Sequence, residues 1–408
     1  MINNNKIAFF CHPYHRGGVT RWMADAATAF ADAGKEVYFI TVEPIKEFFS
    51  AKGRETLLEL LAKQHSKAHI VSTQVGYEFE FGTPEYRAFI YKKLLAQLPA
   101  CTPVIVSDDA VVWAAATALY ATYPVIGVLH SDEDTYYNLA IQYQQQASFF
   151  ACVSGRVHNA LKIKIPVYDQ AHIATIPCGI DITAFGPASG NGPLKLVYAG
   201  RLTAYQKRAG DLALICRELA KTEIHFHLHI VGDGDLKDTI EQEIIVDGLG
   251  QQVTFHGWLP RQEVATLLGK CDILLLTSDS EGMPIAMMEA LASGCGVVGT
   301  RVSGIEDQEH QTLAMQCFRV YTTGDIPDAI HKIKEIEAIP KAARQQAARQ
   351  LAETEFSMEK CMARYKQAIA TINFTPSPLP KVRLTVAEGI HSRAIAFARS
   401  VKVRLLHS

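Results

Sequence analysis

The stretch DILLLTSDSEGMPIAMMEALASGCGVVGT, residues 272–300, contains a complete strand–helix–strand unit. Its first apolar run is strand-like, and Pro284 fits the first helical turn, where its missing N–H leaves no partner unsatisfied. "GVVGT" is a second apolar strand, and short strands without polar alternation indicate a parallel sheet covered on both faces. Glu281 falls in the loop and Glu289 inside the largely apolar helix, and these two glutamates require a reason other than core packing.

The same alternation of strands and helices runs through most of the chain, in two blocks. Five strand-like segments lie in the first half (KIAFF, EVYFITV, PVIVS, PVIGVLH and SFFACVS), and the second half restarts with LKLVYAG, IHFHLHIVGDG and VTFHG. A chain of 408 residues is too long for one ordinary core. We therefore expect two doubly wound, Rossmann-like α/β domains, residues 1–182 and 194–355, joined by a Gly- and Pro-rich linker at 183–193.

Composition and charge exclude several classes of protein. Hydrophobic residues make up 48% of the chain and charged residues 20%, which is typical of a soluble globular protein, and the net charge of −2 argues against a nucleic-acid binder. The uncharged run from Ala110 to Leu129 is long enough for a membrane span, but the break at Tyr123-Pro124 favours a buried helix followed by a buried strand. No signal peptide is visible, and the nine cysteines contain no CxxC pair, so we expect a cytoplasmic protein with reduced thiols.

The C-terminal segment 376–408 differs from the rest in charge. It begins with a Pro-rich break and carries six basic residues and one acidic residue. One interpretation is a solvated terminal helix that packs on the body. The alternative is an interfacial helix that is attracted to anionic lipid, which would place the protein peripherally at the inner membrane face.

Residues at the predicted strand ends suit a phosphorylated ligand, since ligands of doubly wound sheets bind at the carboxyl ends of the strands. Gly17 and Gly18 lie between the first strand and the first helix, where glycines permit close backbone approach and the helix N-terminus offers free N–H groups. Arg201 and Lys207 follow the strand LKLVYAG, and Lys207 is expected to open a helix. Two cations at one strand end suit a diphosphate, although solvated surface charges would give the same pattern.

Glycines mark two further turns at the same edge. Gly232 and Gly234 follow one strand and Gly257 follows the next, so backbone groups there could meet a nucleobase, and ordinary turn chemistry explains each of them equally well. Glu281 and Glu289 complete the set, because carboxylates are good acceptors for the paired hydroxyls of a sugar or a ribose.

Taken together, these segments resemble the retaining nucleotide-sugar glycosyltransferases of family 4, which have the GT-B fold of two Rossmann-like domains facing across a cleft. The resemblance rests on the Glu–seven residues–Glu motif in SEGMPIAMMEALASGCGVVGT. It also rests on the order and spacing of VYAGRL, QKR, HIVGDGDL, VTFHGWLP, CVSGRVHNAL and IPCGIDITAF. It covers the chain to about residue 372 and implies that a helix within 356–375 crosses back to the first domain.

The resemblance implies a role for each candidate residue. Glu281 would hold the donor sugar, with backbone groups of Gly282, Met283 and Pro284 beside it, and Glu289 would bind the ribose. Arg201 and Lys207 would hold the diphosphate and stabilise the leaving charge. The remaining donor contacts would come from Gly17, Gly18, Gly232 and Gly257. His130 would lie near the reacting sugar, where it could bind the sugar or orient the acceptor.

The acceptor side is expected to include His15, Asp132 and Asp134 and to receive a glycan, a lipid-linked saccharide or a small molecule. We expect no cofactor and no metal, with a nucleoside-diphosphate sugar as co-substrate. His225, His227 and His229 have a spacing that can bind zinc, but they fall in a strand that is expected to be buried. Met283-Pro284 stands where the family more often has Phe-Gly. An epimerase or hydrolase of the same fold and a non-catalytic sugar-nucleotide binder are the rival interpretations.

Overall fold

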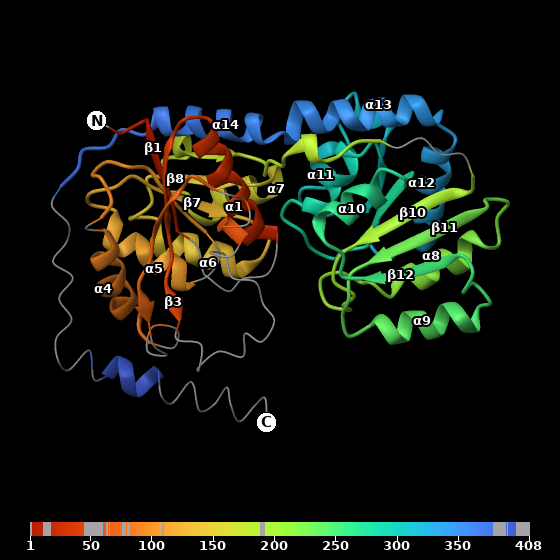
Figure 1. The fold of residues 1–408 in the computed structure, drawn as a ribbon, viewed down its shortest axis with the longest axis horizontal. Helices are drawn as coiled ribbons and strands as arrows, with labels where there is room; N and C mark the ends of the chain where they lie inside the picture. The colour runs from red at the N-terminus through yellow and green to blue at the C-terminus, as the bar shows by residue number, and fades with distance from the viewer. Residues whose placement is uncertain are drawn as a thin grey trace. The chain divides into compact units, whose positions relative to one another are not determined.

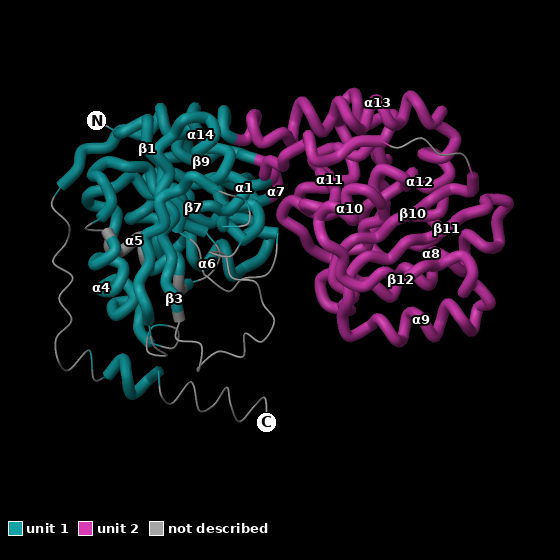
Figure 2. The backbone as a smooth tube through the Cα atoms, in the orientation of Figure 1, with its two compact units in different colours: residues 1–153, 157–176, 362–408 teal, residues 154–156, 177–361 magenta. Residues whose placement is uncertain are grey.

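The computed structural model describes residues 2–10, 18–44, 60–62, 64, 66–75, 79, 82–95, 97–107, 110–187, 192–377, 389 and 391–396. The chain forms two compact units, which Figure 2 shows in different colours. Unit 1 comprises residues 1–153, 157–176 and 362–408, and unit 2 comprises residues 154–156 and 177–361. Both units are therefore discontinuous in sequence.

Unit 1 is built on a parallel sheet of seven strands in the order β4-β2-β1-β6-β7-β8-β9. The strands are short and apolar, and β7 is buried along its whole length. The order reverses between β1 and β6, as in doubly wound folds. The bounds of the strands are β1 Lys6–Phe10, β2 Glu36–Ile40, β4 His69–Val71, β6 Val104–Val106, β7 Val125–Leu129, β8 Phe149–Cys152 and β9 Ile173–Thr175, and a separate pair joins β3 Glu43–Pro44 to β5 Gln74–Val75.

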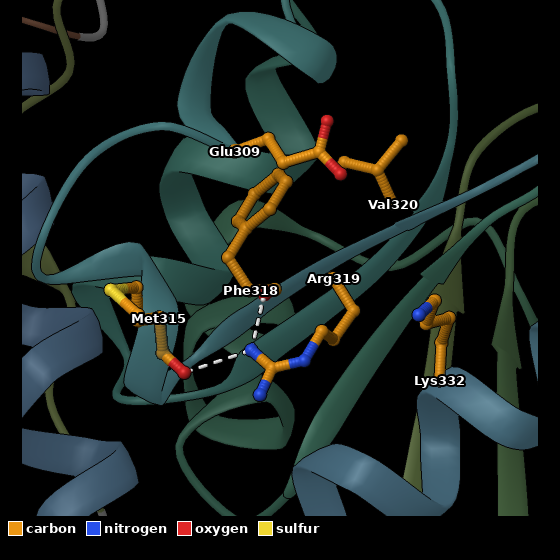
Figure 3. Close-up of a pocket in the computed structure, with 6 residues that line it drawn as sticks. All are labelled: Glu309, Met315, Phe318, Arg319, Val320 and Lys332. Carbon is orange, nitrogen blue, oxygen red and sulfur yellow. Dashed lines mark hydrogen bonds between the residues drawn. The ribbon is translucent and has the colours of Figure 1, made fainter.

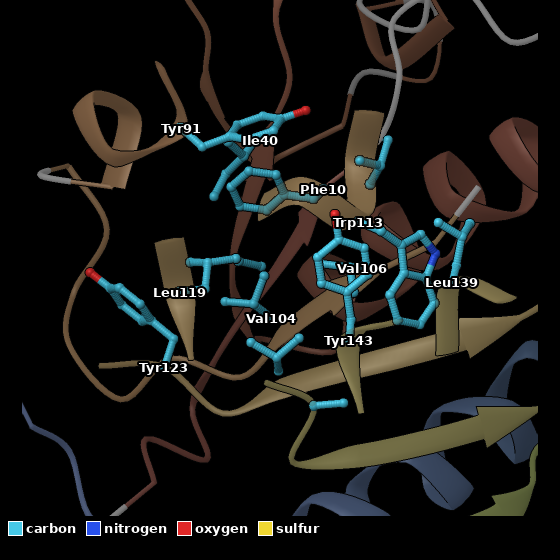
Figure 4. Packing of buried hydrophobic residues seen from close by; sticks show 14 of the residues in the cluster. Phe10, Ile40, Tyr91, Val104, Val106, Trp113, Leu119, Tyr123, Leu139 and Tyr143 are labelled. Carbon is cyan, nitrogen blue, oxygen red and sulfur yellow. The ribbon is translucent and has the colours of Figure 1, made fainter. Parts of the chain in front are cut away.

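The helices of unit 1 connect these strands and cover the sheet (Figure 1). They are α1 Gly18–Asp32, α4 Pro84–Leu95, α5 Ala110–Leu119, α6 Asp134–Tyr143 and α7 Gly155–Lys164, whose first two residues belong to unit 2. Figure 4 shows part of the core of unit 1, in which Phe10 of β1 and Tyr91 of α4 lie side by side. The two rings pack edge-on at 5.1 Å between their centroids. Trp113 stacks on Tyr143 in the same core at 6.1 Å.

Unit 2 contains a second parallel sheet, of six strands in the order β12-β11-β10-β13-β14-β15. Numbered from its own first strand this order is 3-2-1-4-5-6, which is the Rossmann order. The prediction of two parallel, doubly wound α/β domains is therefore confirmed. The bounds of these strands are β10 Leu194–Ala199, β11 Phe226–Val231, β12 Val253–Gly257, β13 Ile273–Leu276, β14 Gly296–Thr300 and β15 Phe318–Tyr321.

Helices cover both faces of the unit 2 sheet (Figure 1). On one side α8 (Asp211–Leu219) contacts α9 (Lys237–Val246) and α12 (Ile326–Glu337), and on the other α11 (Ile285–Ala292) contacts α10 (Arg261–Leu268) and α13 (Lys341–Leu351). The buried Arg344 of α13 donates to the Asp272 carboxylate over 3.1 Å and to the Ile336 carbonyl over 3.0 Å. The bond to Asp272 pairs the buried guanidinium with an opposite charge, which offsets the cost of removing it from water.

The segments that join the two halves pack with particular units. Residues 177–182, which the sequence interpretation placed in the first domain, cluster with unit 2. The Arg349 guanidinium of α13 donates to the carbonyls of Ile182, Phe185 and Ala292 at 3.0, 2.7 and 2.8 Å. The chain then continues through a π-helical turn, Ala352–Phe356, into α14 (Met358–Thr371). Most of α14 clusters with unit 1.

Within the described part of the chain, no helix combines the length and apolar character that spanning a bilayer requires. The uncharged run at 110–129 forms α5 and the buried strand β7, as the break at Tyr123-Pro124 indicates. Most of the basic segment 376–408 lies outside the described residues. Its described turn at 391–396 packs on unit 1, where the Ser392 hydroxyl accepts a hydrogen bond from the Thr83 N–H over 3.2 Å.

Candidate active site

The candidate site lies where the strand order of unit 2 reverses, between the adjacent parallel strands β10 and β13. Ligands of doubly wound sheets bind at this switch point, outside the carboxyl ends of the strands. The loop after β10 carries Arg201 and Lys207, and the loop after β13 carries Glu281. The topology therefore brings together two loops that are separated by more than sixty residues of sequence.

Lys207 and Glu281 form an ion pair at this point. The Lys207 ammonium lies 2.5 Å from the Glu281 carboxylate, and the Ser278 hydroxyl donates to the same oxygen over 2.6 Å. The Glu281 side chain is 8% exposed and that of Lys207 19% exposed. The pair is therefore largely desolvated, and its two charges are held in place at the carboxyl ends of β10 and β13.

The turn that carries Lys207 has an unusual backbone. Gln206 and Arg208 adopt positive φ values of 66° and 45°, in the region that favours glycine. The Thr277 hydroxyl donates to the Lys207 carbonyl over 2.7 Å, which ties the turn to the end of β13. The prediction that Lys207 opens a helix is wrong, because α8 begins only at Asp211 and the lysine lies in the turn before it.

Arg201 is held by the same turn. Its guanidinium donates to the Gln206 side-chain oxygen over 2.7 Å, and its carbonyl accepts from the Tyr198 hydroxyl over 2.7 Å. The arginine side chain is exposed at the strand end, so the structure leaves its remaining N–H groups accessible to a ligand. Sequence reasoning missed Gln206, since nothing in QKR marks a glutamine that accepts from an arginine five residues earlier.

Glu289 lies on α11, inside the helix as predicted, while Glu281 lies in the loop before it. The Arg261 guanidinium, at the start of α10, is 3.7 Å from the Glu289 carboxylate, and it also lies 5.4 Å over the Phe185 ring. The two glutamates therefore have different basic neighbours: Lys207 for Glu281 and Arg261 for Glu289.

Two of the predicted glycines, Gly232 and Gly257, are required for different physical reasons. A Cβ on Gly232, whose φ is 130°, would lie 1.9 Å from the Gly200 carbonyl oxygen, so this position is fixed by packing between backbones. Gly257 has a φ of 65° and open space around it, so its glycine meets a conformational need and leaves room for a ligand. Trp258 follows it with 65% of its surface exposed.

The loop at Gly282 and Met283 is supported by a segment that the sequence analysis left without a role. Gly304 has a φ of 75°, and a Cβ there would lie 2.2 Å from the Gly282 carbonyl oxygen and 3.0 Å from the Met283 Cα. Pro284 precedes the first residue of α11, and Met283 is buried. The Ser303 hydroxyl shares a 2.7 Å hydrogen bond with that of Ser154, which also belongs to unit 2.

His130 lies in unit 1, at the end of β7. Trp22 of α1 packs edge-on against its imidazole at 4.8 Å between ring centroids, and Tyr365 of α14 packs on Trp22 at 6.0 Å. Burial lowers the pKa of His130 to about 3, so the ring is neutral at physiological pH. A neutral imidazole can donate or accept a hydrogen bond but adds no positive charge.

The other predicted residues of unit 1 have local partners or lie outside the described residues. The Asp132 carboxylate accepts from the Tyr137 hydroxyl over 2.6 Å, and burial together with this bond raises the pKa of Tyr137. Asp134 is exposed at the start of α6, 3.4 Å from the Lys164 ammonium. Gly18 is the first residue of α1 and is exposed. The predictions for Gly17 and His15 fall outside the described residues.

The histidines of β11 correct one expectation. His225 precedes the strand and is exposed, while His227 and His229, which alternate with buried residues, are half-buried. The face of β11 that carries these histidines is therefore less buried than predicted. His229 shares a 3.1 Å hydrogen bond with His256 of β12, and His227 bonds Thr254 over 2.9 Å. Among the described residues no cluster of three metal-ligating side chains has a geometry that could hold a metal ion.

A surface hollow near the edge strand β15 is separate from the candidate site. Figure 3 shows the Arg319 guanidinium donating to the Met315 and Phe318 carbonyls, each over 2.8 Å. The other lining residues are Glu309, Val320 and Lys332. The Arg319 guanidinium also bonds Glu335. The Arg319 guanidinium is thus already paired with a carboxylate, and none of the predicted site residues lines this hollow.

Both halves of the chain match family models of glycosyltransferases. Residues 16–184 match the model described as Glycosyltransferase Family 4, and residues 193–336 match the model described as Glycosyl transferases group 1. Each unit contains a parallel, doubly wound sheet, as each Rossmann-like domain of a GT-B glycosyltransferase does. The chain thus has the domains and the fold of a GT-B glycosyltransferase.

Two of the curated proteins that the chain resembles are glycosyltransferases by name. The amylovoran biosynthesis glycosyltransferase AmsK of Erwinia amylovora is 36% identical over 121 residues, 28% of this chain and 30% of that protein. The lipopolysaccharide 1,6-galactosyltransferase of Salmonella typhimurium is 30% identical over 164 residues, 39% of this chain and 44% of that protein. The matches span less than half of these relatives.

Solved structures resemble the chain over most of its length. A glycosyltransferase from Rickettsia africae has a TM-score of 0.71 at 16% identity, and HepE of Anabaena, in complex with UDP and glucose, has a TM-score of 0.69 at 18% identity. In both cases the match covers 90% of this chain and 99% of the other. At these identities the likeness concerns the GT-B fold.

Proposed function

We propose that this protein is a retaining glycosyltransferase that moves a sugar from a nucleoside-diphosphate sugar to an acceptor hydroxyl during glycan synthesis. The observation that carries the proposal is the Lys207–Glu281 pair at the switch point of unit 2, with Arg201 on the same loop. A carboxylate for sugar hydroxyls and two cations for a diphosphate, side by side at a strand end, match the chemistry of such a donor.

In the proposed reaction the bond between the sugar's anomeric carbon and the diphosphate oxygen breaks. A bond from the acceptor oxygen forms on the same face. The acceptor proton passes to the departing phosphate, so no protein nucleophile is required. Lys207 and Arg201 stabilise the negative charge that develops on the leaving group, as preorganised cations do. Glu281 orients the donor sugar and Glu289 accepts from the ribose hydroxyls.

We further propose that transfer requires no metal, because Lys207 and Arg201 supply the positive charge that a divalent ion provides in other phosphate sites. Purified protein treated with EDTA should retain its full initial rate. A rate that falls on chelation and returns with Mg²⁺ or Mn²⁺ would overturn this part of the proposal.

The acceptor is proposed to be a saccharide, free or lipid-linked. Two names support this class of acceptor, since AmsK is named for amylovoran biosynthesis and the Salmonella enzyme is named a lipopolysaccharide 1,6-galactosyltransferase. We place the reaction in the cytoplasm, and the six basic residues of 376–408 would favour a position near anionic lipid. If the protein sediments equally with anionic liposomes whether or not it carries residues 376–408, the proposed contact of this segment with the membrane is wrong.

The decisive experiment is a thermal-shift screen against UDP-, GDP- and ADP-sugars, followed by product analysis with and without saccharide acceptors. A specific donor at a hundred times its Kd stabilises the folded state by about 2.7 kcal/mol. Transfer to an acceptor with retained anomeric configuration supports the proposal. Turnover without an acceptor indicates an epimerase or hydrolase, and binding without turnover indicates a non-catalytic binder.

A further inference from the structure

We infer that Gln206 is a positioning residue, which holds the Arg201 guanidinium toward the diphosphate of the donor. The inference deepens the proposed function and rests on it. Its basis is the turn 205–208, defined here as the strained turn, in which a glutamine occupies a backbone conformation that favours glycine.

The backbone of the strained turn is costly. Gln206 has a φ of 66° and Arg208 a φ of 45°, and among the described residues the only other non-glycine with positive φ is Cys101. Residues held in such regions are disfavoured and cluster at functional sites. Glycine would adopt the same conformation without the steric cost, so the side chains present here need a reason of their own.

The side chain of Gln206 forms a contact that explains why a glutamine stands at this position. Its oxygen accepts a hydrogen bond from Nη2 of Arg201 over 2.7 Å. Arg201 is exposed, and an exposed arginine loses conformational freedom when it binds a ligand. The glutamine restricts this freedom beforehand, and it uses one of five guanidinium donors, so the others remain for phosphate oxygens.

An amide suits this task better than a carboxylate would. A glutamate at position 206 would also hold Arg201, but its negative charge would offset the guanidinium and repel a diphosphate. The neutral amide oxygen orients the cation and leaves its charge intact. This distinguishes position 206 from Glu281, whose carboxylate pairs directly with Lys207.

The rest of the strained turn is anchored on both sides, so Gln206 has little freedom to move. Its carbonyl accepts from the Asp279 N–H over 2.8 Å. Arg208 donates to both oxygens of Asp211 over 2.9 and 3.2 Å and lies 3.6 Å from Asp279. The Arg208 guanidinium therefore fixes the turn to its own unit, and Arg201 is the arginine of this loop that is left to meet a ligand.

The test uses the full chain and two substitutions at one position. Gln206→Asn tolerates the left-handed backbone but is one methylene too short to reach Arg201, and Gln206→Gly removes both the side chain and the strain. Gln251→Asn is the matched control, since Gln251 is exposed in unit 2 before β12. Isothermal titration with UDP, GDP and ADP, each beside its monophosphate, measures the contribution of the second phosphate.

We expect both Gln206 variants to bind the preferred diphosphate about tenfold more weakly, equivalent to about 1.4 kcal/mol. We expect them to bind the corresponding monophosphate within about twofold of wild type. The urea midpoint of unit 2 in Gln206→Gly, monitored by hydrogen exchange on peptides of β13 and α11, should equal or exceed that of wild type. Gln251→Asn should match wild type throughout.

Two results would overturn the inference. Unchanged diphosphate affinity in both variants would show that Gln206 does not position Arg201. Equal losses for mono- and diphosphate, together with a lowered urea midpoint in Gln206→Gly, would show a structural role alone. If wild-type protein binds none of the nucleotides, the proposed function fails and this inference with it, whereas wild-type binding with unaltered variants removes only the inference.

Discussion

Replacing Lys207 by Met separates the structural and catalytic contributions of the ion pair. The substitution keeps much of the side-chain volume and removes the ammonium that lies 2.5 Å from the Glu281 carboxylate. That carboxylate then keeps the Ser278 hydroxyl as its donor among the contacts described at the site, in a position where it is 8% exposed. An uncompensated charge in such a place is unfavourable.

The expected loss follows from the burial of the pair. Breaking a fully buried pair costs about 3–5 kcal/mol, and the partial exposure of Lys207 together with the Ser278 bond reduces this to about 2–3 kcal/mol here. Urea titration monitored by hydrogen exchange on peptides of β13 and α11 reports the stability of unit 2 by itself. A single global unfolding midpoint does not, because the protein has two units. Transfer should fall about 100- to 1000-fold, as when a preorganised electrostatic group is removed.

The double variant Lys207→Met/Glu281→Gln supplies the control. Removing both charges should return the stability of unit 2 to within about 1 kcal/mol of wild type, because no unpaired carboxylate remains. Transfer should stay at or below the level of the single variant, because Glu281 is itself proposed to orient the donor sugar. Recovery of transfer along with stability would refute the reasoning, since Lys207 would then be a structural residue only.

Other predictions concern pH, backbone and stacking. Because burial lowers the pKa of His130 to about 3, the unfolded chain takes up a proton below about pH 6.5 that the folded chain does not. Stability should therefore fall by about 2 kcal/mol from this group between pH 6.5 and 5, and His130→Gln should lose that component in urea titrations; an identical pH dependence would contradict the assignment. Gly304→Ala should cost about 1–3 kcal/mol and weaken donor binding, since its Cβ would meet the Gly282 carbonyl; wild-type stability by urea titration would disprove this. Nucleotides should quench Trp258 fluorescence, and Trp258→Ala should weaken nucleoside binding by about 1–3 kcal/mol in calorimetry, whereas unaltered affinity would exclude base stacking.

The fold could be predicted from the sequence because its main signals are local. The apolar strands and the turn residues between them are short, contiguous segments, so the βαβ unit at 272–300 and the strand 125–129 are recognisable from the sequence alone. The positions of Glu281 in a loop and Glu289 in a helix followed from Pro284. The prediction that Glu281 and Lys207 lie at the same edge of the sheet needed one further rule, the placement of ligands at the carboxyl ends of parallel strands. Their direct ion pair was not predicted.

The missing parts of the site depend on contacts between distant segments. The close approach of Gly304 to the Gly282 carbonyl joins loops that follow different strands, and no spacing in the sequence encodes it. The strained backbone at Gln206 was equally hidden, because glutamine has no preference for positive φ. The start of α8 at Asp211 is also not predictable from the sequence, because helix propensity does not mark where the irregular turn at Lys207 ends.

The discontinuity of the two units constrains how this chain can be synthesised and divided. Residues 154–156 belong to unit 2, and Tyr365 of α14 packs on Trp22 near the beginning of the chain. On a ribosome, the first unit cannot complete its packing until residues beyond 362 have emerged, by which time all of the second unit has been made. A cut at residue 182 would likewise leave the first fragment without α14 and the second fragment without residues 154–156. A separable first domain would therefore have to carry 362–377 as a fused segment.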